Sequence, residues 1–269
     1  MIKIVISNQR GGAAKTTTTL NLARYYADQG KRVLIIDTDP QGSITVVLGL
    51  SDTGKPLYKN PGKSLFNFLI HGHSLEDCIV SVHPLIDLLP SNRQTVEAEQ
   101  MLLAQIAREL TFVNVLPKVD AAYDVVLFDV APSISLLQTC AVLYTQQILV
   151  PVSMDPLSIA GLVASVETAR MLSQYFSRPI KTVAILPVII DKRLGVTKRV
   201  MDDLETISAE TGVPLLPGIP TDSTVTKASG ESFLADFDPT CRAMLAYIEA
   251  FDALGKLLNI EVPVPVSLS

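Results

Sequence analysis

Residues 8–19 read NQRGGAAKTTTT and stand between an apolar run, residues 2–7, and a helical pattern that begins at Leu20. A strand, a glycine-rich turn, a Lys-Thr pair and a helix, in this order, are typical of phosphate-binding loops. The order matters because backbone N–H groups of the turn and the positive end of the helix can surround phosphate oxygens directly. In such a loop Lys15 adds positive charge near the β and γ phosphates, and Thr16 offers a hydroxyl to Mg²⁺. The competing interpretation is a plain glycine turn with solvated side chains.

The loop departs from the usual GxxxxGK[ST] pattern at both ends, because Gln9 replaces its first glycine and Ala14 the glycine before the lysine. Its RGGAAK layout resembles the deviant Walker A box, KGGxxK[ST], of the ParA/MinD family of partition and positioning ATPases. The family's first lysine reaches the nucleotide of the partner subunit, and here that position is Arg10. Two interpretations remain open: Arg10 is the trans-acting catalytic cation, or it folds back on its own subunit and Lys192 or Arg193 takes that role. The resemblance implies ATP contacts from Arg10, Gly11, Gly12, Ala13, Ala14, Lys15, Thr16 and Thr17.

A second apolar run, residues 31–37 (KRVLIID), predicts a strand buried on both faces that ends in carboxylates. By itself, DxDP after a strand is equally well explained as a turn. The longer stretch VLIIDTDPQGS resembles the DxDPQ motif of the same family. That resemblance implies that Asp39 positions the attacking water and that Asp37 supports Mg²⁺ or Lys15.

Residues 123–133 (YDVVLFDVAPS) predict a further buried strand that ends in an aspartate, which is a Walker B pattern. Asp129 is therefore assigned to Mg²⁺, together with Thr16 and Asp37, and the DxxPS continuation resembles the family. The alternative is that Asp129 caps a helix starting near residues 132–136.

The remaining chain alternates strands and helices. Asp155, in the link VSMDP, either faces the ribose or the dimer interface or simply caps the next helix, in which Ala160, Gly161 and Ala164 permit close packing. The stretch IPTDSTVTKASGESFLADFDP resembles the last family motif, which implies that Asp191, Pro220 and Thr221 contact the adenine. Further predicted elements are helices at 65–70, 75–80, 156–172, 196–211 and 238–258, strands at 86–89, 147–151 and 181–190, a surface loop at 51–63 and a flexible tail at 259–269.

Composition excludes several classes of protein. Hydrophobic residues make up 48% of the 269 and charged residues 18%, which argues against disorder. The three cysteines form no CxxC pair, so neither a disulfide framework nor a zinc site is expected. Without a leader-like start or an apolar run of membrane-spanning length, a cytoplasmic protein is expected. The net charge of −5 means that any binding to DNA requires a local basic patch.

These features predict one domain over residues 1–269, an α/β fold with a doubly wound, mostly parallel sheet flanked by helices. The alternation places the ligand at the carboxyl edge of the strands, and the resemblance implies the P-loop NTPase fold of the deviant Walker (SIMIBI) type.

The resemblance further implies an ATP- and Mg²⁺-dependent homodimer that binds nucleoid DNA non-specifically and is released when a ParB-like or McdB-like activator stimulates slow hydrolysis. The variant loop resembles those of the cyanobacterial carboxysome-positioning members, although plasmids and chromosome regions are also cargoes of this family. Membrane binding is disfavoured because the C-terminal region 249–269 carries only Lys256 as a basic residue. Candidate DNA contacts are Arg193, Lys198, Arg199, Lys227, Arg242 and Lys256.

Two other classes remain as alternatives. A metabolic P-loop ligase of the same superfamily would consume ATP to join small molecules. A pseudo-ATPase scaffold is disfavoured by Lys15, Asp39 and Asp129, and a nitrogenase-reductase-like carrier by the cysteine pattern.

Overall fold

Seven strands form one sheet in the order β3-β4-β2-β5-β1-β6-β7. This computed structural model describes residues 1–49, 62–117 and 121–259. All neighbouring strands are parallel except β3 and β4. The strands are β1 (Ile2–Ile6), β2 (Val33–Asp37), β3 (Val80–His83), β4 (Ile86–Leu89), β5 (Val125–Asp129), β6 (Gln147–Ser153) and β7 (Lys181–Val188).

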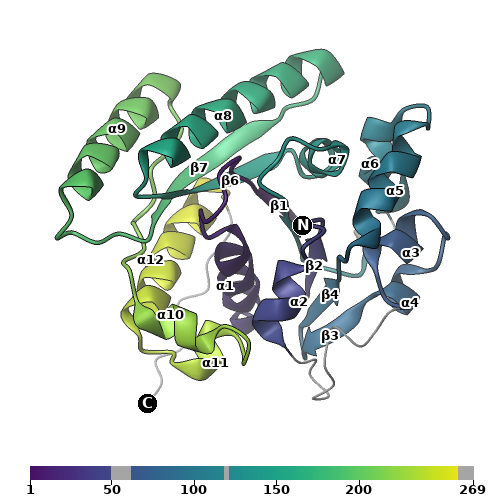
Figure 1. Cartoon of the computed structure of the whole chain (residues 1–269), viewed down its shortest axis with the longest axis horizontal. Helices are drawn as coiled ribbons and strands as arrows, with labels where there is room; N and C mark the ends of the chain where they lie inside the picture. Colours follow the sequence, from purple (N-terminus) through teal and green to yellow (C-terminus); the bar gives the residue numbers. More distant parts are fainter. Residues whose placement is uncertain (50–61, 118–120, 260–269) are drawn as a thin grey trace.

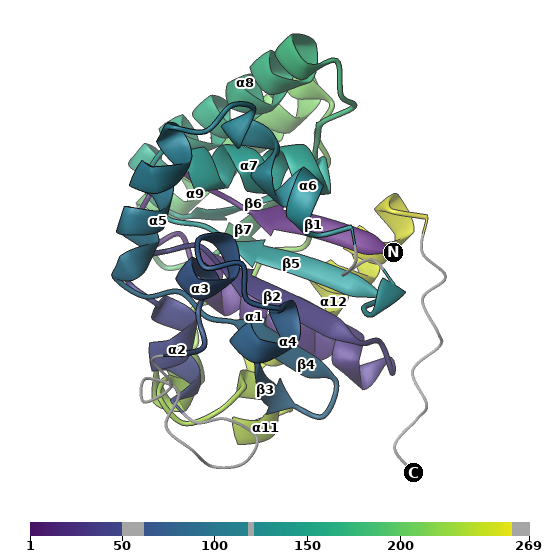
Figure 2. The same ribbon diagram turned by 90° about the vertical axis from the view of Figure 1, so that its right-hand side faces the viewer.

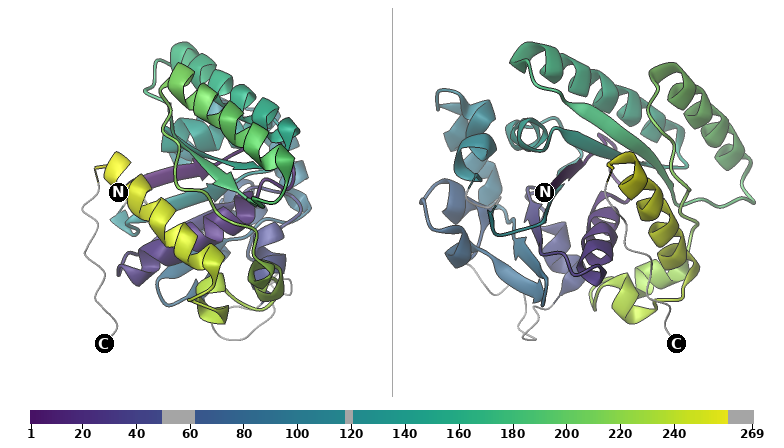
Figure 3. Two further views of the ribbon diagram at one scale, coloured as in Figure 1. Left: turned by 90° about the vertical axis from the view of Figure 1, so that its left-hand side faces the viewer. Right: turned by 180° about the vertical axis from the view of Figure 1, so that it is seen from behind.

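Helices cover both faces of the sheet (Figure 1, Figure 3). They are α1 (Lys15–Asp28), α2 (Ser43–Leu48), α3 (Leu65–Leu69), α4 (Leu75–Cys78), α5 (Gln94–Leu103), α6 (Thr111–Val115), α7 (Leu136–Thr145), α8 (Pro156–Phe176), α9 (Gly195–Thr211), α10 (Ser223–Ala228), α11 (Leu234–Phe237) and α12 (Arg242–Leu257), with a short 3₁₀ turn, η2 (Arg108–Leu110). One core packs α1 and α12 on one face, and a second packs α7, α8 and α9 on the other.

The central strands are buried along their whole length, since every residue of β2 and β5 is buried. A strand with both faces covered must be apolar throughout, which explains why these two were evident from sequence. Parallel pairing brings their carboxyl ends to the same edge, as Figure 2 shows for β2, β5 and β1. The predicted doubly wound, mostly parallel fold is confirmed.

Several predicted boundaries were wrong, and two elements are longer than expected: α8 ends at Phe176 rather than at 172, and β6 at Ser153 rather than at 151. The helix expected at 75–80 ends at Cys78, and Val80 begins β3, an edge strand that was not predicted. The C-terminal helix begins at Arg242 rather than at 238, because the Asp238 carboxylate accepts the N–H of Thr240 and closes a separate turn. The strand expected at 181–190 ends at Val188. Most of the predicted loop at 51–63 and of the tail at 259–269 lies outside the described residues.

Candidate nucleotide-binding site

The loop between β1 and α1 takes the turn that its glycines predict, with one strained position. Gly12 has a φ of 75° and Ala14, at the N-cap of α1, a φ of 53°. A left-handed conformation costs a residue with a Cβ roughly 1–2 kcal/mol. The alanine that replaces the usual glycine before Lys15 therefore keeps the glycine conformation and leaves strain in the loop.

The base of the loop rests on α8 through Asn8. This side chain is fully buried, and its Nδ2 donates to the carbonyl of Pro151 at 2.8 Å while its Oδ1 accepts the N–H of Arg10 at 2.9 Å. A Cβ at Gly161 would lie 2.1 Å from that Oδ1. The close packing expected from the small residues of α8 is thus found at Gly161, directly beneath the phosphate-binding loop.

Lys15 is held inside the loop, with 8% of its surface exposed. Its Nζ donates to the carbonyl of Arg10 at 3.0 Å. Burial lowers the pKa of Lys15, and the nearby charges of Asp129 and Asp39 oppose that shift. The ammonium is positioned to exchange this carbonyl for a phosphate oxygen.

Asp37 and Asp129 are neighbours in register at the ends of β2 and β5. The hydroxyl of Thr16 donates to Asp129 at 2.7 Å, whereas Oδ2 of Asp37 is buried without a hydrogen-bond partner. Burial raises the pKa of Asp37 well above its ordinary value, and the charge of Asp129 raises it further. Burial also raises the pKa of Asp129 to about 7.

Two buried carboxylates beside a hydroxyl fit a hard cation, because the cation would satisfy the orphaned oxygen and offset the repulsion. Within the described ranges, no group of three or more His, Cys, Asp or Glu side chains could hold a metal by itself. A Mg²⁺ bound here would therefore also need phosphate or water oxygens. The capping alternative for Asp129 was wrong, since Ser135 caps α7 through the N–H of Gln138.

Asp39 lies just beyond these carboxylates, where the chain turns toward α2. Its N–H donates to Oδ1 of Asp37 at 2.9 Å, and its own carboxylate accepts the N–H of Gln41 at 2.9 Å. It is half-buried. Its predicted role toward water stays a prediction.

Arg10 folds back on its own chain. Its guanidinium reaches Oδ2 of Asp155 at 3.1 Å and 3.3 Å, and Oδ1 of Asp155 caps α8 through the N–H of Leu157. That capping bond and then Arg10 lower the pKa of the Asp155 carboxyl. Exposed ion pairs of this kind contribute little to stability, so Arg10 can leave Asp155 at small cost. A trans role in a dimer stays a prediction.

A cavity of about 360 Å³ extends from the loop toward the end of β7. Of the predicted base contacts, Pro220 and Thr221 line it, but Asp191 does not. Asp191 instead lines a neighbouring hollow of about 600 Å³ that also contains Pro220 and Thr221, where Arg193 binds both of its carboxylate oxygens and lowers its pKa to about 2. Its predicted contact with the base stays a prediction. The remaining lining residues are Gly12, Ala14, Thr17, Val188, Ile189, Ile219, Asp222, Val225, Thr226 and Tyr247. Asp222 and Tyr247 were missed: Asp222 directly follows Thr221 in the stretch that resembles the last family motif and could have been included, whereas Tyr247 stands in no recognisable motif.

The six candidate DNA contacts do not form one patch. Arg193 and Arg242 line one hollow of about 600 Å³ together with Lys192. Lys198 and Arg199 are exposed on α9 and Lys227 on α10, whereas Lys256 is at the far end of α12. At about 1.5 Å per residue, Lys256 lies roughly 20 Å from Arg242.

None of the helices in the described ranges combines the length and the apolar composition that a membrane span requires.

Comparison with known proteins agrees with this geometry. A family model described as an AAA domain matches residues 1–182, which hold the loop, Asp39 and Asp129. The chain belongs to this family and is a ParA/MinD-type ATPase.

This ATPase is 29% identical over 203 residues to the sporulation initiation inhibitor protein Soj of Bacillus subtilis, covering 75% of this chain and 78% of Soj. Among solved structures, cobyrinic acid a,c-diamide synthase of Mycobacterium smegmatis with bound ADP and magnesium is 28% identical, with a TM-score of 0.78 over 96% of each chain. Apo McdA of Cyanothece superposes with a TM-score of 0.81 over 96% of this chain and 99% of that one; at 18% identity this shows the shared fold alone.

Proposed function

We propose that this ATPase binds ATP with Mg²⁺, forms an ATP-dependent homodimer, binds DNA non-specifically and positions or segregates a cargo. The observation that carries the proposal is the convergence of Lys15, the 2.7 Å Thr16–Asp129 pair and the orphaned oxygen of Asp37 at one edge of the sheet. Such an arrangement suits a nucleoside triphosphate with its metal.

Each residue has a distinct part in this proposal. Lys15 binds the β and γ phosphates, and Thr16 and Asp129 hold Mg²⁺ with Asp37 beside them. The metal, when bound, neutralises charge on the phosphates. Asp39 orients the attacking water, and Pro220 and Thr221 pack against the adenine. Arg10 leaves Asp155 and reaches the phosphates of the partner subunit, a role for which its five donors suit it.

DNA binding is assigned to the exposed basic residues at the carboxyl edge and on α9. Because the chain carries a net charge of −5, a monomer offers few phosphate contacts, and a dimer doubles them. Lys198, Arg199 and Lys227 are the main candidates, with Arg193 and Arg242 at the neighbouring hollow. Lys256 is a weaker candidate because it lies at the other end of α12.

Membership of the family supports a proposal about the cellular setting. We propose one cytoplasmic, nucleoid-associated domain over residues 1–269 and a ParB-like or McdB-like activator of hydrolysis. The relatives include Soj and a chromosome partitioning protein ParA of Myxococcus xanthus, which favour a partition role. Because the variant loop resembles those of carboxysome-positioning ATPases, we rank a carboxysome first as the cargo. Plasmids and chromosome regions are the other possible cargoes.

Gel shift on random-sequence DNA with ATP, ADP or no nucleotide tests the proposal. A shift with ATP alone is expected, weakening as salt rises. Lys15→Ala should lose both the shift and ATP binding by calorimetry. Lys181→Ala, which removes an exposed lysine at the start of β7 on the opposite sheet edge, should behave like the unmodified protein. No shift under any condition, or one insensitive to salt, would contradict DNA binding.

A second candidate is an ATP-dependent synthase that joins small molecules. It is favoured by the likeness to cobyrinic acid a,c-diamide synthase over 96% of the chain. ATP turnover that requires an added carboxylic acid and amine donor, with a product of matching mass, would support this function. Turnover that instead rises with DNA and an activator protein would support the first.

A further inference from the structure

The short helix α2 is fixed at both ends by glycines that approach neighbouring backbone. It follows directly on the Asp39 segment. At its start, a Cβ on Gly42 would lie 3.0 Å from the carbonyl oxygen of Ser91. At its end, a Cβ on Gly49 would lie 2.7 Å from the carbonyl oxygen of Gly230. Both glycines have positive φ, 61° and 70°, so α2 has little freedom to move independently of these two neighbours.

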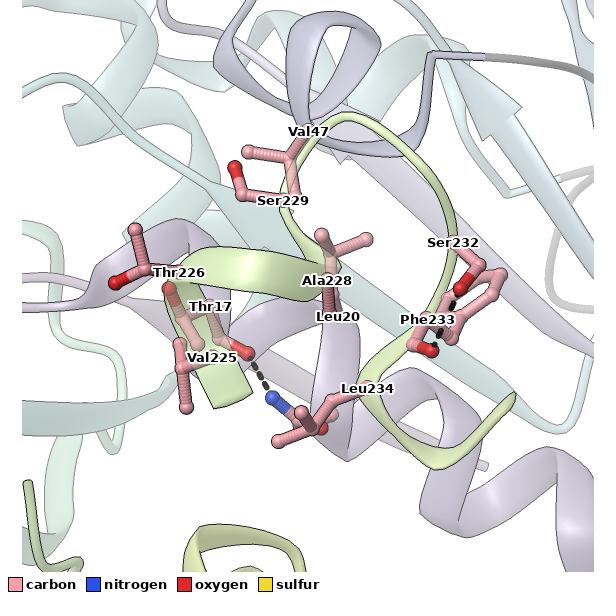
Figure 4. A pocket seen from close by; sticks show the side chains of 11 residues that line it. Thr17, Leu20, Val47, Val225, Thr226, Ala228, Ser229, Ser232, Phe233 and Leu234 are labelled. Carbon is pink, nitrogen blue, oxygen red and sulfur yellow. Dashed lines mark hydrogen bonds between the residues drawn. The ribbon is translucent and has the colours of Figure 1, made fainter. Parts of the chain in front are cut away.

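The contact at the end of α2 is also a hydrogen bond. The N–H of Gly230 donates to the carbonyl of Val47 at 2.6 Å. Gly230 lies between α10 and α11, and its φ is 89°. Figure 4 shows the side chain of Val47 over Ser229 at the end of α10. We call this contact of Val47 and Gly49 with Ser229 and Gly230, which includes the Val47 side chain, the α2–α10 clasp.

The other end of this connection is the cavity assigned to the nucleotide base. Val225 and Thr226 of α10 line that cavity and also line a second one of about 250 Å³ under the clasp (Figure 4). Helix α10 therefore forms a wall between the two. Its first turn is anchored, because Asp222 accepts the N–H of Thr224 with one oxygen and that of Ala243 of α12 with the other.

We propose that the α2–α10 clasp makes Asp39 respond to the base of the bound nucleotide, so that Gly49 and Gly230 are positioning residues for hydrolysis. This inference rests on the proposed function. A base that fills the cavity packs against α10 near its anchored end. When the base displaces α10, the movement of its C-terminal end reaches α2 directly, because no side chain separates Gly49 from the carbonyl of Gly230. A shift of about 1 Å at a reacting group is enough to change a rate by up to roughly 100-fold.

The experiment compares hydrolysis of ATP and GTP at saturating concentration, so that differences in affinity do not enter. For the unmodified protein, kcat with ATP should exceed kcat with GTP by about 10-fold, because a misplaced Asp39 with GTP lowers the rate by part of the roughly 100-fold that a shift of about 1 Å can cost. Gly49→Ala places a methyl group on the carbonyl of Gly230 and opens the clasp. Its kcat ratio should fall toward 1, with ATP affinity retained.

Gly72→Ala is the matched control, because Gly72 has a similar φ of 66° but open space around its Cβ position. It bears the same backbone strain without touching the clasp and should keep the full kcat ratio. Val47→Ala, which trims the side chain over Ser229, is a milder second variant should Gly49→Ala fold poorly, and it should lower the ratio in part.

Retention of the full ratio in a folded Gly49→Ala, or in Val47→Ala when the former does not fold, would overturn the inference. So would a ratio near 1 in the unmodified protein. An unmodified protein that hydrolyses no nucleotide, with or without DNA, would refute the proposed function itself, which distinguishes the two failures.

Discussion

Replacement of Gly161 by alanine tests whether α8 supports the phosphate-binding loop. Gly161 lies inside α8, where alanine normally stabilises a helix by about 1 kcal/mol relative to glycine. Here the added Cβ would lie 2.1 Å from Oδ1 of Asn8, 3.2 Å from its Cγ and 3.4 Å from the backbone nitrogen of Arg10. Helix propensity therefore predicts that the substitution raises the free energy of unfolding, whereas packing predicts that it lowers it.

The packing effect should be the larger. A methyl group forced into a filled site costs about 1–3 kcal/mol. Moving Asn8 also weakens its two buried hydrogen bonds, to Pro151 and from Arg10, at about 0.5–1.5 kcal/mol each. After subtraction of the propensity gain, the free energy of unfolding should fall by about 1–5 kcal/mol. For a chain of this size, at about 2 °C per kcal/mol, that corresponds to a Tm lower by roughly 2–10 °C.

Thermal unfolding and ATP calorimetry measure the two expected consequences. ATP affinity should fall because Asn8 fixes the N–H of Arg10 at the start of the loop. Gly195→Ala, at the start of α9, is the control, since it is also a helical glycine but its Cβ would have open space and its φ is not positive. A Gly161→Ala protein with unchanged Tm and unchanged affinity would refute the argument that α8 holds the loop through Asn8.

Three further predictions concern charged residues of the site. Asp39→Ala should bind ATP, hydrolyse it slowly and accumulate as a dimer; a variant that sediments as a monomer with ATP would contradict the role of Asp39. Arg10→Ala should bind ATP as a monomer without dimerising. Asp155→Asn keeps the helix cap but loses the charge that holds Arg10, so it should dimerise at a lower ATP concentration. Normal dimerisation of Arg10→Ala would show that another residue supplies the trans cation. Because the pKa of Asp129 is about 7 in the folded chain and 3.8 is its ordinary value, folding binds a proton between these values, and stability without nucleotide should fall as pH rises from about 4 to 7. Asp129→Asn should reduce that fall in urea unfolding at pH 5 and pH 8, and an identical pH dependence would contradict the raised pKa.

The sequence predicted the central part of the fold better than its edges. Strands β2 and β5 are apolar up to their terminal aspartates because both faces are covered, so their pattern is strong and these aspartates are easily placed. The edge strand β3 was missed because it has four residues, half of them only partly buried, and pairs with β4 across an irregular register. The start of α12 was misplaced because a turn closed by Asp238 also fits a helical pattern.

The order of neighbouring residues was enough to predict the phosphate-binding loop and the carboxylates that end β2 and β5. The alternation of strand and helix patterns was enough to predict a doubly wound sheet. These features need only neighbouring residues, so they can be read from sequence. The tertiary structure decided which distant groups meet. It paired Arg10 with Asp155, placed Asp191 in an ion pair with Arg193, and set Gly161 beneath Asn8. Such contacts join residues far apart in sequence or depend on one side-chain rotamer, and a single sequence carries no local signal for either.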